Sequence, residues 1–310
     1  MSDLDGERKE SRKVAVLMST YNGEKFLREQ IESLFAQVGV DLTVYVRDDG
    51  SSDGTLEILR RYESEKFIVT VGNNLGPANS FMELLYSVPD TYDYYAFSDQ
   101  DDIWAPDKLS AGIQMLEEKG ALLYGCNQML VDKDGNELGV WRKEGYKVST
   151  TPIEVIVRNS ISGCTMIFTR KLFLIVTTEE HRPSNDFFSS IYHDNWIAAV
   201  ASLYSGILYD FRAFIKYRQH GNNVVGINKR NGFFKKLRMF ICPKKRNLNS
   251  NFAYEICYEF PEESKNFPLL SICSKSKTFK QKREILKHAK EIYGDDMKLT
   301  KYLYILRGLF

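Results

Sequence analysis

The chain has 310 residues, of which 43% are apolar and 13% aromatic, so it can bury a substantial core and is not a disordered protein. Its formal net charge of +1 conceals an uneven distribution. Residues 229–310 contain 19 Lys and Arg against 8 Asp and Glu, whereas residues 1–228 contain 23 against 33. The acidic first part argues against a nucleic-acid-binding protein, and no nucleic-acid partner is expected.

Cysteine usage and hydropathy indicate the compartment. The five cysteines are odd in number, widely spaced and without a CxxC pair, which argues against a disulfide framework and a zinc site. Residues 1–13 are polar and charged, and each long apolar run is interrupted by charges. We therefore expect a cytoplasmic protein without a membrane span.

Short apolar runs alternate with helix-period segments from Lys13 to about Leu130, which predicts a βαβα order and a mainly parallel sheet. The expected strands lie at residues 14–19, 42–47, 67–72, 93–98 and 121–131. The expected helices lie at residues 24–37, 55–62, 78–86 and 109–118. The fold class is therefore α/β.

The second half of the chain is less regular. Residues 131–160 contain turn residues and mixed strand signals, and we expect them to frame an acceptor pocket. Beyond them we expect a buried strand at 162–168, a helix with an acidic start at 191–204 and a strand at 207–219. The Gly- and Asn-rich segment 220–228 marks a boundary between a domain over residues 13–228 and a basic, mostly helical region over residues 229–310.

DDGSSDGT, residues 48–55, directly follows the second expected strand. In a parallel sheet, ligands bind outside the carboxyl ends of the strands. Asp48 and Asp49 would then face a cleft in which a base or a ribose can be hydrogen-bonded. The alternative is a strand-to-helix turn in which Asp53 caps the helix.

SDQDD, residues 98–102, places Asp99, Asp101 and Asp102 at the end of another expected strand. Three carboxylates this close repel one another, and a hard cation such as Mg²⁺ or Mn²⁺ would accept their oxygens. Such a cation stabilises a leaving phosphate as a Lewis acid. The alternative is a solvated acidic turn, which the flanking aromatic residues disfavour.

Two further segments offer reactive side chains. Asp194, at the start of the expected helix 191–204, can remove a proton from an incoming hydroxyl as a general base, and a helix cap is the alternative. YRQHGNN, residues 217–223, offers His220 to a metal or a diphosphate and Arg218 as a nearby cation. A purely structural histidine is the alternative for His220.

Together and in this order, four segments resemble the N-terminal signature of family-2 glycosyltransferases of the GT-A fold: VAVLMSTYNGEKFLREQIESLFAQ, DDGSSDGT, NNLGPANSF and FSDQDDIW. The resemblance is strongest over residues 13–110 and extends to about residue 228. Within the family, SDQDDIW, HDNW and YRQHGNN are most similar to segments of bacterial rhamnosyltransferases of cell-wall and capsular polysaccharides. The resemblance implies a Rossmann-like, nucleotide-sugar-binding GT-A domain over residues 13–228.

The resemblance also implies roles on the nucleotide side. It places Thr20, Tyr21 and Asn22 in the nucleotide pocket beside Asp49, with Asp48 sharing the role. Further contacts with substrate are expected from Asn74, Asp99, Asp102, Trp104, His193 and Arg218.

The roles implied for catalysis follow from three matches. Asp99 and Asp101 match the DxD motif, the first near the ribose and the second on the metal, and His220 matches a histidine near metal and diphosphate. Asp194 matches the aspartate of the family's Glu-Asp base motif, in which His193 here replaces the usual glutamate. The expected metal ligands are therefore Asp101, Asp99 and His220, and the expected catalytic residue is Asp194.

The implied activity is metal-dependent, inverting transfer of a sugar, with Mg²⁺ or Mn²⁺ as the cofactor and dTDP-L-rhamnose or a UDP-sugar as the donor. The QxxRW motif of processive synthases is absent, so the addition of one or a few sugars to a lipid-linked saccharide is expected. One alternative is a non-catalytic nucleotide-sugar-binding scaffold. Another is a nucleotidyltransferase, which usually carries a glycine-rich phosphate loop where this chain has STYNGEKF.

The basic tail contains two stripes of apolar residues at helical spacing, typical of interfacial helices. The first consists of Phe233, Phe234, Leu237, Phe240 and Ile241, and the second of Leu299, Tyr302, Leu303, Leu306 and Phe310. Basic residues around them are attracted by an anionic leaflet, which predicts peripheral attachment to the inner face of the cell membrane. The alternatives are packing against the first domain and a homodimer contact.

Overall fold

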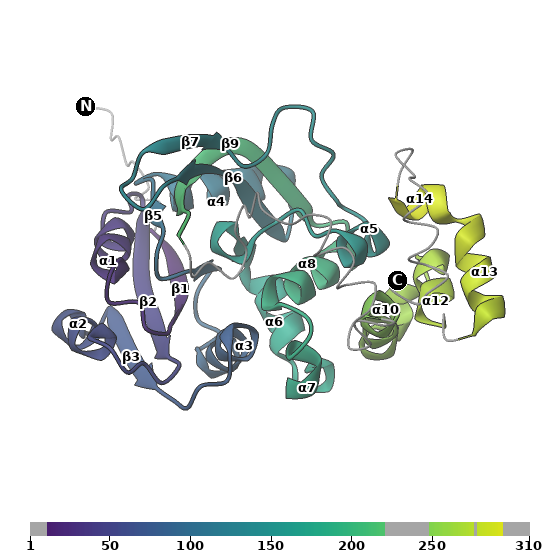
Figure 1. The fold of residues 1–310 in the computed structure, drawn as a ribbon, viewed down its shortest axis with the longest axis horizontal. Helices are drawn as coiled ribbons and strands as arrows, with labels where there is room; N and C mark the ends of the chain where they lie inside the picture. Colours follow the sequence, from purple (N-terminus) through teal and green to yellow (C-terminus); the bar gives the residue numbers. More distant parts are fainter. Residues whose placement is uncertain (1–10, 221–247, 276–277, 294–310) are drawn as a thin grey trace, which may run out of the picture.

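The computed structural model describes residues 11–220, 248–275 and 278–293. At its centre is a nine-stranded sheet with the strand order β3-β2-β1-β4-β8-β6-β9-β5, in which β7 pairs with β6 (Figure 1). The strands are β1 (Arg12–Thr20), β2 (Val40–Asp48), β3 (Phe67–Val71), β4 (Tyr94–Ser98), β5 (Ile103–Trp104), β6 (Leu123–Val131), β7 (Glu137–Val140), β8 (Ile167–Thr169) and β9 (Ile207–Arg218).

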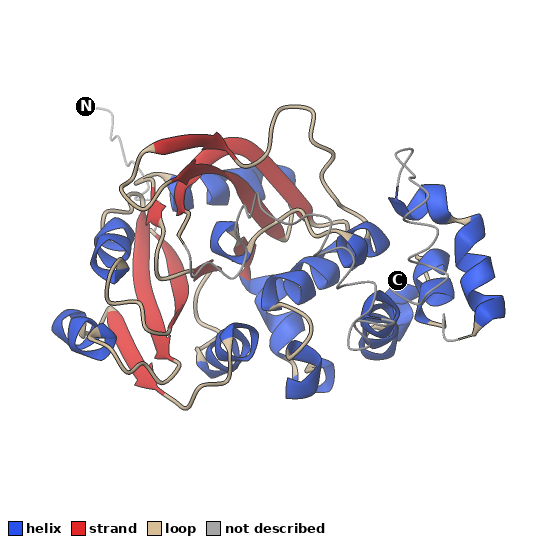
Figure 2. Ribbon diagram, in the orientation of Figure 1, coloured by secondary structure: helices blue, strands red, loops and turns tan. Residues whose placement is uncertain are grey.

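Helices lie on both sides of this sheet, and the end of the molecule on the right of the view is formed by the C-terminal helices (Figure 2). The α-helices are α1 (Leu27–Phe35), α2 (Thr55–Tyr62), α3 (Pro77–Ser87), α4 (Lys108–Lys119), α5 (Pro152–Val157), α6 (Arg170–Thr177), α7 (Asn185–Phe188), α8 (His193–Leu203), α10 (Leu248–Glu259), α11 (Pro261–Ser264), α12 (Pro268–Ser274), α13 (Phe279–Lys287) and α14 (Ala289–Tyr293). Short 3₁₀ helices lie at Gly163–Thr165 and Glu179–His181.

The buried middle of strand β1, residues 14–18, separates two hydrophobic layers. Ala15 and Leu17 belong to the core that contains α3, α6 and α8, whereas Val14, Val16 and Met18 belong to the core that contains α1, α2 and α4. Successive side chains of a strand point to opposite faces, so an uninterrupted apolar run packs against helices on both sides. The predicted α/β architecture is confirmed.

The sheet has a parallel half and a mixed half. Strands β3, β2, β1 and β4 are parallel to one another, as predicted. β8 is antiparallel to both β4 and β6, β6 and β9 are parallel, and the short β5 is antiparallel to β9. The parallel half gathers the carboxyl ends of its strands at one edge of the sheet.

The strand predicted at residues 162–168 is only partly correct. Residues 167–169 form β8, but residues 163–165 form a 3₁₀ turn. The Thr165 hydroxyl and backbone N–H both donate to the Ser162 carbonyl, at 2.7 and 2.9 Å, and Met166 N–H donates to the Gly163 carbonyl at 2.9 Å. These local bonds replace the sheet ladder over this segment.

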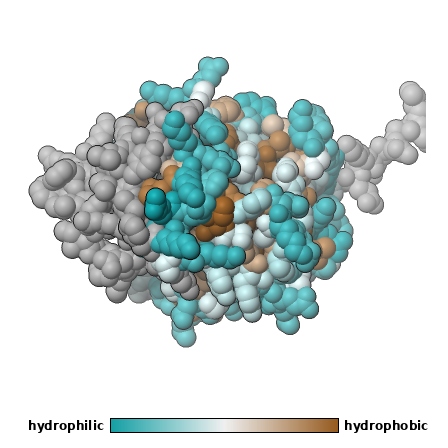
Figure 3. All heavy atoms as spheres, turned by 90° about the vertical axis from the view of Figure 1, so that its right-hand side faces the viewer, coloured by the Kyte–Doolittle hydropathy of each residue, from teal (hydrophilic) through white to brown (hydrophobic). Residues whose placement is uncertain are grey.

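The described C-terminal helices share a core with the sheet domain. The rings of Phe252 and Phe260 lie 6.5 and 6.0 Å from the ring of Trp196 in α8. Seen from this end, hydrophobic residues gather in the middle of the face among hydrophilic ones (Figure 3). Both apolar stripes predicted in the tail lie outside the described residues. Within the described ranges, no helix is both long enough and apolar enough to cross a membrane.

Candidate active site

Three neighbouring parallel strands, β2, β1 and β4, end at the same edge of the sheet. Thr20 at the end of β1 is in register with Asp48 at the end of β2, and Asp49 N–H donates to the Thr20 carbonyl at 2.8 Å. β4 ends at Ser98, directly before the carboxylates of the SDQDD segment. Both acidic segments therefore reach the edge at which parallel sheets bind ligands.

A cavity of about 950 Å³ lies at this edge. Nine of the residues predicted from the sequence line it: Tyr21, Asn22, Asp49, Asn74, Asp99, Asp101, His193, Asp194 and His220. Residues that are far apart in the chain thus share one cavity.

The loop after β1 is hydrogen-bonded to residues 99–102, which follow β4 and are called the carboxylate loop below. Gln100 accepts the Tyr21 N–H at 2.8 Å and donates from its side-chain amide to the Tyr21 carbonyl at 3.0 Å. Asn22 has a φ of 48°, in the left-handed region that Asn tolerates, and its side chain accepts the Ser52 N–H at 2.8 Å. These bonds hold the half-exposed Tyr21 ring at the cavity.

The Asp49 carboxylate is oriented by several donors. It accepts the N–H groups of Leu75 and Gly76, both at 2.9 Å, and pairs with the Arg47 guanidinium. Arg47 also donates to the Ser80 hydroxyl at 2.9 Å. Because the side chains of Arg47 and Asp49 are 8% and 3% exposed, the pair forms a rigid corner of the cavity wall.

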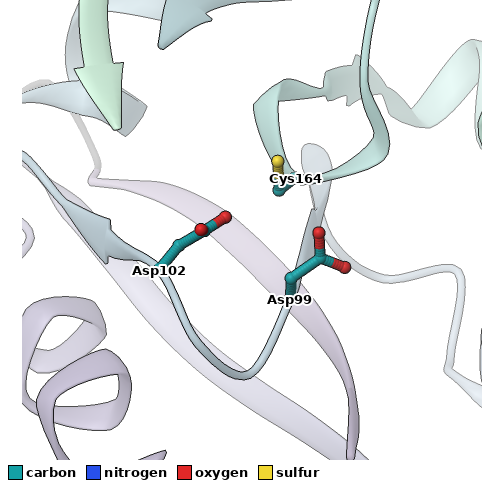
Figure 4. Close-up of side chains that lie close together, drawn as sticks. All are labelled: Asp99, Asp102 and Cys164. Atoms are coloured by element: carbon teal, nitrogen blue, oxygen red, sulfur yellow. The ribbon is translucent and has the colours of Figure 1, made fainter. Parts of the chain in front are cut away.

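The carboxylates that follow β4 are crowded and largely buried. Asp99 and Asp102 lie close to Cys164, with one ligand atom of each residue within 4.8 Å of the others (Figure 4). Burial, together with the charges of Asp101 and Asp194, raises the pKa of Asp99 to about 7. Burial and the same kind of repulsion raise the pKa of Asp102 well above its usual range. A cation would stabilise this concentration of negative charge.

The residues predicted to bind metal supply a suitable donor set. His220 Nε2 lies 2.7 Å from Asp101 Oδ2, and both side chains line the cavity together with Asp99. Carboxylate oxygens with one imidazole nitrogen suit a divalent cation such as Mn²⁺. The donor chemistry of these three side chains therefore fits the expected cofactor, whereas the ligand atoms that lie within 4.8 Å of one another in the described residues are those of Asp99, Asp102 and Cys164.

Asp194 lies in the first turn of α8 and faces the same cavity. Its carboxylate accepts the Gly163 N–H at 3.1 Å and the Asn195 N–H at 2.7 Å. Burial raises the pKa of Asp194 to about 6, although these two bonds lower it. The cap position of α8 is Tyr192, so Asp194 does not occupy the alternative role of N-cap. A carboxylate of this pKa is ionised at pH 7 and still accepts a proton readily.

His193, beside Asp194, is held between aromatic rings. It stacks on Phe81 with 4.1 Å between ring centroids and meets Phe97 edge-on at 4.8 Å. Burial lowers the pKa of His193 to about 3, so the ring is neutral at physiological pH. Its two ring nitrogens have no hydrogen-bond partner among the described residues. His193 therefore does not supply a charge next to Asp194.

Five residues predicted to contact substrate are not among those that line the cavity, and their contact with substrate stays a prediction. They are Thr20, Asp48, Asp102, Trp104 and Arg218, all at most 3% exposed. The Thr20 hydroxyl donates to Asp48 Oδ2 at 2.9 Å, and Asp48 also accepts the Ser51 N–H at 2.8 Å. Thr20 and Asp48 thus join the ends of two strands.

The other three support the carboxylate loop. Trp104 lies beneath the buried Lys108, whose ammonium is 3.4 Å from the ring centroid. Arg218 donates from its side chain to Glu29 at 2.6 Å and to the Asp101 carbonyl at 3.2 Å, and its N–H donates to Asp102 Oδ1 at 3.3 Å. The guanidinium therefore holds the loop from behind.

Sequence reasoning missed several lining residues, among them Lys25, Gln128, Trp141, Cys164 and Tyr192. Lys25 was visible in the STYNGEKF segment as the first cation after β1. Trp141 follows β7 within residues 131–160, the segment expected to frame an acceptor pocket. No local pattern marks Gln128 or Cys164, because both reach the cavity only through the tertiary fold.

An α/β fold with this mixed sheet, and an acidic cavity at the carboxyl ends of its parallel strands, is the arrangement of GT-A glycosyltransferases. The profile of Glycosyl transferase family 2 matches residues 15–174, and the chain belongs to this family.

Two named relatives are similar in sequence. The dTDP-rhamnosyl transferase RfbG of Shigella flexneri is 29% identical over 218 residues, which cover 68% of this chain and 74% of RfbG. The putative teichuronic acid biosynthesis glycosyltransferase TuaG of Bacillus subtilis is 27% identical over 154 residues, which cover 49% of this chain and 59% of TuaG.

Two solved structures share the fold. Residues 1–349 of TarS from S. aureus align with a TM-score of 0.53 and 17% identity, over 95% of this chain and 90% of that one. The mannosyltransferase PcManGT from Pyrobaculum calidifontis, in complex with GDP-Man and Mn²⁺, aligns with a TM-score of 0.51 and 16% identity, over 97% of this chain and 86% of that one.

Proposed function

We propose that this glycosyltransferase is a metal-dependent, inverting enzyme that transfers L-rhamnose from dTDP-L-rhamnose to a lipid-linked saccharide during cell-surface polysaccharide synthesis. One observation carries the proposal: Asp99 and Asp101, which follow β4, line the same cavity as Asp194 of α8. The name of RfbG supports rhamnose as the sugar. A UDP-hexose donor is the second candidate, because TarS, which shares the fold, has been solved with UDP at a TM-score of 0.52.

The donor nucleotide would bind where β1 and β2 end. Tyr21 presents a half-exposed ring to the cavity, and Asn22, Asp49 and Asn74 present polar groups next to it. An aromatic face beside fixed hydrogen-bonding groups suits a nucleobase and its ribose.

Asp99, Asp101 and His220 would hold Mg²⁺ or Mn²⁺ near the diphosphate. When bound, the cation supplies Lewis-acid stabilisation of the leaving nucleoside diphosphate. The protein fixes these ligands from behind, since Arg218 binds the Asp101 carbonyl and Gln100 binds both backbone groups of Tyr21.

Asp194 would act as the general base. Its carboxylate accepts the proton of an acceptor hydroxyl, whose oxygen attacks the anomeric carbon from the face opposite the nucleotide. One displacement inverts the configuration, so a β-linked donor gives an α-linked product. With its pKa lowered to about 3, His193 is a much weaker base than Asp194, which leaves Asp194 as the proton acceptor at this position.

The domain organisation and the cellular location are further parts of the proposal. We propose a catalytic domain over residues 13–228 and a basic helical region over residues 229–310 that binds the inner face of the cell membrane or a second subunit. Co-sedimentation with vesicles, with and without anionic lipid, tests the first option. No binding to either kind of vesicle would favour the contact with a second subunit.

The direct test is a donor screen. The purified chain is incubated with Mn²⁺ and dTDP-L-rhamnose, UDP-glucose or UDP-N-acetylglucosamine, and thermal stability and nucleoside diphosphate release are measured. A ligand at about one hundred times its Kd stabilises the fold by about 2.7 kcal/mol, so the preferred donor gives the largest shift. Stabilisation without diphosphate release would favour a scaffold, and NTP formation that depends on pyrophosphate would favour a nucleotidyltransferase.

A further inference from the structure

The 3₁₀ turn Gly163–Thr165 lies between the two acidic parts of the cavity. It precedes β8, and both Gly163 and Cys164 line the cavity. The bonds from Thr165 and Met166 back to the carbonyls of Ser162 and Gly163 make the turn a closed local unit. Adjacent residues of this unit contact Asp194 on one side and the carboxylates after β4 on the other.

Gly163 provides the contact with Asp194. Its N–H donates to Asp194 Oδ2 at 3.1 Å. A Cβ added at residue 163 would lie 2.6 Å from His193 Nε2 and 3.6 Å from Asp194 Cβ. His193 has little room to withdraw, because it stacks between Phe81 and Phe97. The backbone therefore reaches the Asp194 carboxylate only because residue 163 has no side chain.

Cys164 provides the contact with the carboxylates after β4. Its sulfur accepts the Gln128 side-chain N–H at 3.2 Å and lies within 4.8 Å of carboxylate oxygens of Asp99 and Asp102, near which Figure 4 shows it. Asp102 Oδ2 is buried and has no hydrogen-bond partner in the described residues. The thiol is a weak donor close to the Asp99 and Asp102 carboxylates, so its packing there limits how far these carboxylates can move from the turn.

We propose that Gly163 and Cys164 are positioning residues that fix the separation between the base Asp194 and the cation-binding carboxylates. The inference rests on the proposed function, since it presumes that Asp194 takes the acceptor proton. Gly163 contacts the Asp194 carboxylate, and its neighbour Cys164 contacts the carboxylates after β4. A shift of the turn therefore displaces Asp194 relative to these carboxylates. Displacements of about 1 Å cost about a hundredfold in rate.

The first test replaces Gly163 with Ala. We expect kcat to fall by about a hundredfold while the KM for the donor stays within about twofold, because the donor pocket is formed by other loops. We also expect the acid limb of the pH profile to move to higher pH, because Asp194 loses a hydrogen bond that favours its charged form. Gly206→Ala is the matched control, since its added Cβ would lie 2.9 Å from the Leu122 side chain at the amino end of β6.

The second test compares Cys164→Ala with Cys164→Ser. Serine keeps a donor toward the carboxylates and alanine does not. We expect the Mn²⁺ concentration for half-maximal activity to rise about tenfold in Cys164→Ala and to stay within about threefold of wild type in Cys164→Ser. Equal effects of the two substitutions would overturn the role of the thiol as a donor.

Two measurements that do not need activity separate this inference from the proposed function. The titration of the Asp194 carboxyl is followed by ¹³C NMR, with Asp194→Asn to assign its signal, and Mn²⁺ binding is followed by electron paramagnetic resonance. A folded Gly163→Ala protein with an unchanged Asp194 titration and wild-type kcat would overturn the positioning role. Wild-type protein that releases no diphosphate from any donor would count against the proposed function alone, while the titration and the Mn²⁺ affinities still decide the role of the turn.

Discussion

The raised pKa of Asp194 predicts a specific pH dependence of transfer. With a pKa of about 6, about 9% of the Asp194 carboxyl is ionised at pH 5 and about 99% at pH 8. If Asp194 is the base, kcat/KM therefore falls about tenfold between pH 8 and pH 5. A carboxyl with the ordinary pKa of 3.8 would remain about 94% ionised at pH 5, and the rate would hardly change.

The sign follows from burial. Burial disfavours the charged carboxylate, so a higher pH is needed to ionise Asp194, and activity is lost as the pH falls through about 6. Burial and neighbouring charges also raise the pKa of Asp99, to about 7. The assay therefore uses saturating Mn²⁺, which favours the ionised form of Asp99, and measures donor affinity separately at each pH.

Asp194→Asn tests the same assignment by substitution. Asparagine preserves the shape of the side chain but accepts no proton, so we expect kcat to fall by about 10² to 10⁴ with donor binding retained in a thermal-shift assay. Asp186→Asn, at an exposed aspartate of the nearby helix α7, is the control and should keep wild-type activity. Wild-type transfer by Asp194→Asn, or an acid limb near pH 4, would refute the role of Asp194 as the base.

The remaining predictions concern the cation and the packing around the cavity. Asp101→Asn and His220→Ala should each weaken Mn²⁺ binding by about tenfold or more in paramagnetic resonance titrations, and unchanged affinity would contradict their role as ligands. Arg47→Met should lower the free energy of unfolding by about 3 to 5 kcal/mol in denaturant titrations, because it leaves Asp49 buried without its cation; a loss below about 1 kcal/mol would contradict this. Gly112→Ala should cost about 1 to 3 kcal/mol in the same assay, since its Cβ would lie 2.5 Å from Ile167 Cδ1 and 2.8 Å from the Tyr124 ring, and no measurable loss would contradict this.

The parallel half of the fold and much of the candidate site were predictable, because their signals are local. The apolar runs of β1, β2 and β4 are long enough to indicate strands that are buried on both faces. Asp49 and Asp99 stand directly after two of these strands, and parallel strands end together. Strand position alone therefore brings them to one edge of the sheet.

The direction in which a polar side chain points was not predictable in the same way. Arg218 is in a segment rich in polar groups, so a contact with phosphate was a reasonable expectation. It faces the carbonyl of Asp101 because β9 pairs with β5 beside the carboxylate loop, and that pairing joins distant parts of the chain. Trp104 became buried for the same reason, within β5.

The site also contains electrostatic repulsion between Asp194 and Asp99, which no single segment of the sequence reveals because the two residues are far apart in the chain. Asp194 contributes to the repulsion that raises the pKa of Asp99, so ionising the base makes ionisation of the cation-binding carboxylate harder. A cation next to Asp99 would favour the ionised forms of both Asp99 and Asp194, because it attracts both carboxylates. The proposed base and the proposed cation site therefore depend on each other electrostatically. Gly163 contacts Asp194, and Cys164 lies next to Asp99. In our proposal, these two uncharged residues therefore fix the distance between Asp194 and Asp99, on which the strength of their electrostatic interaction depends.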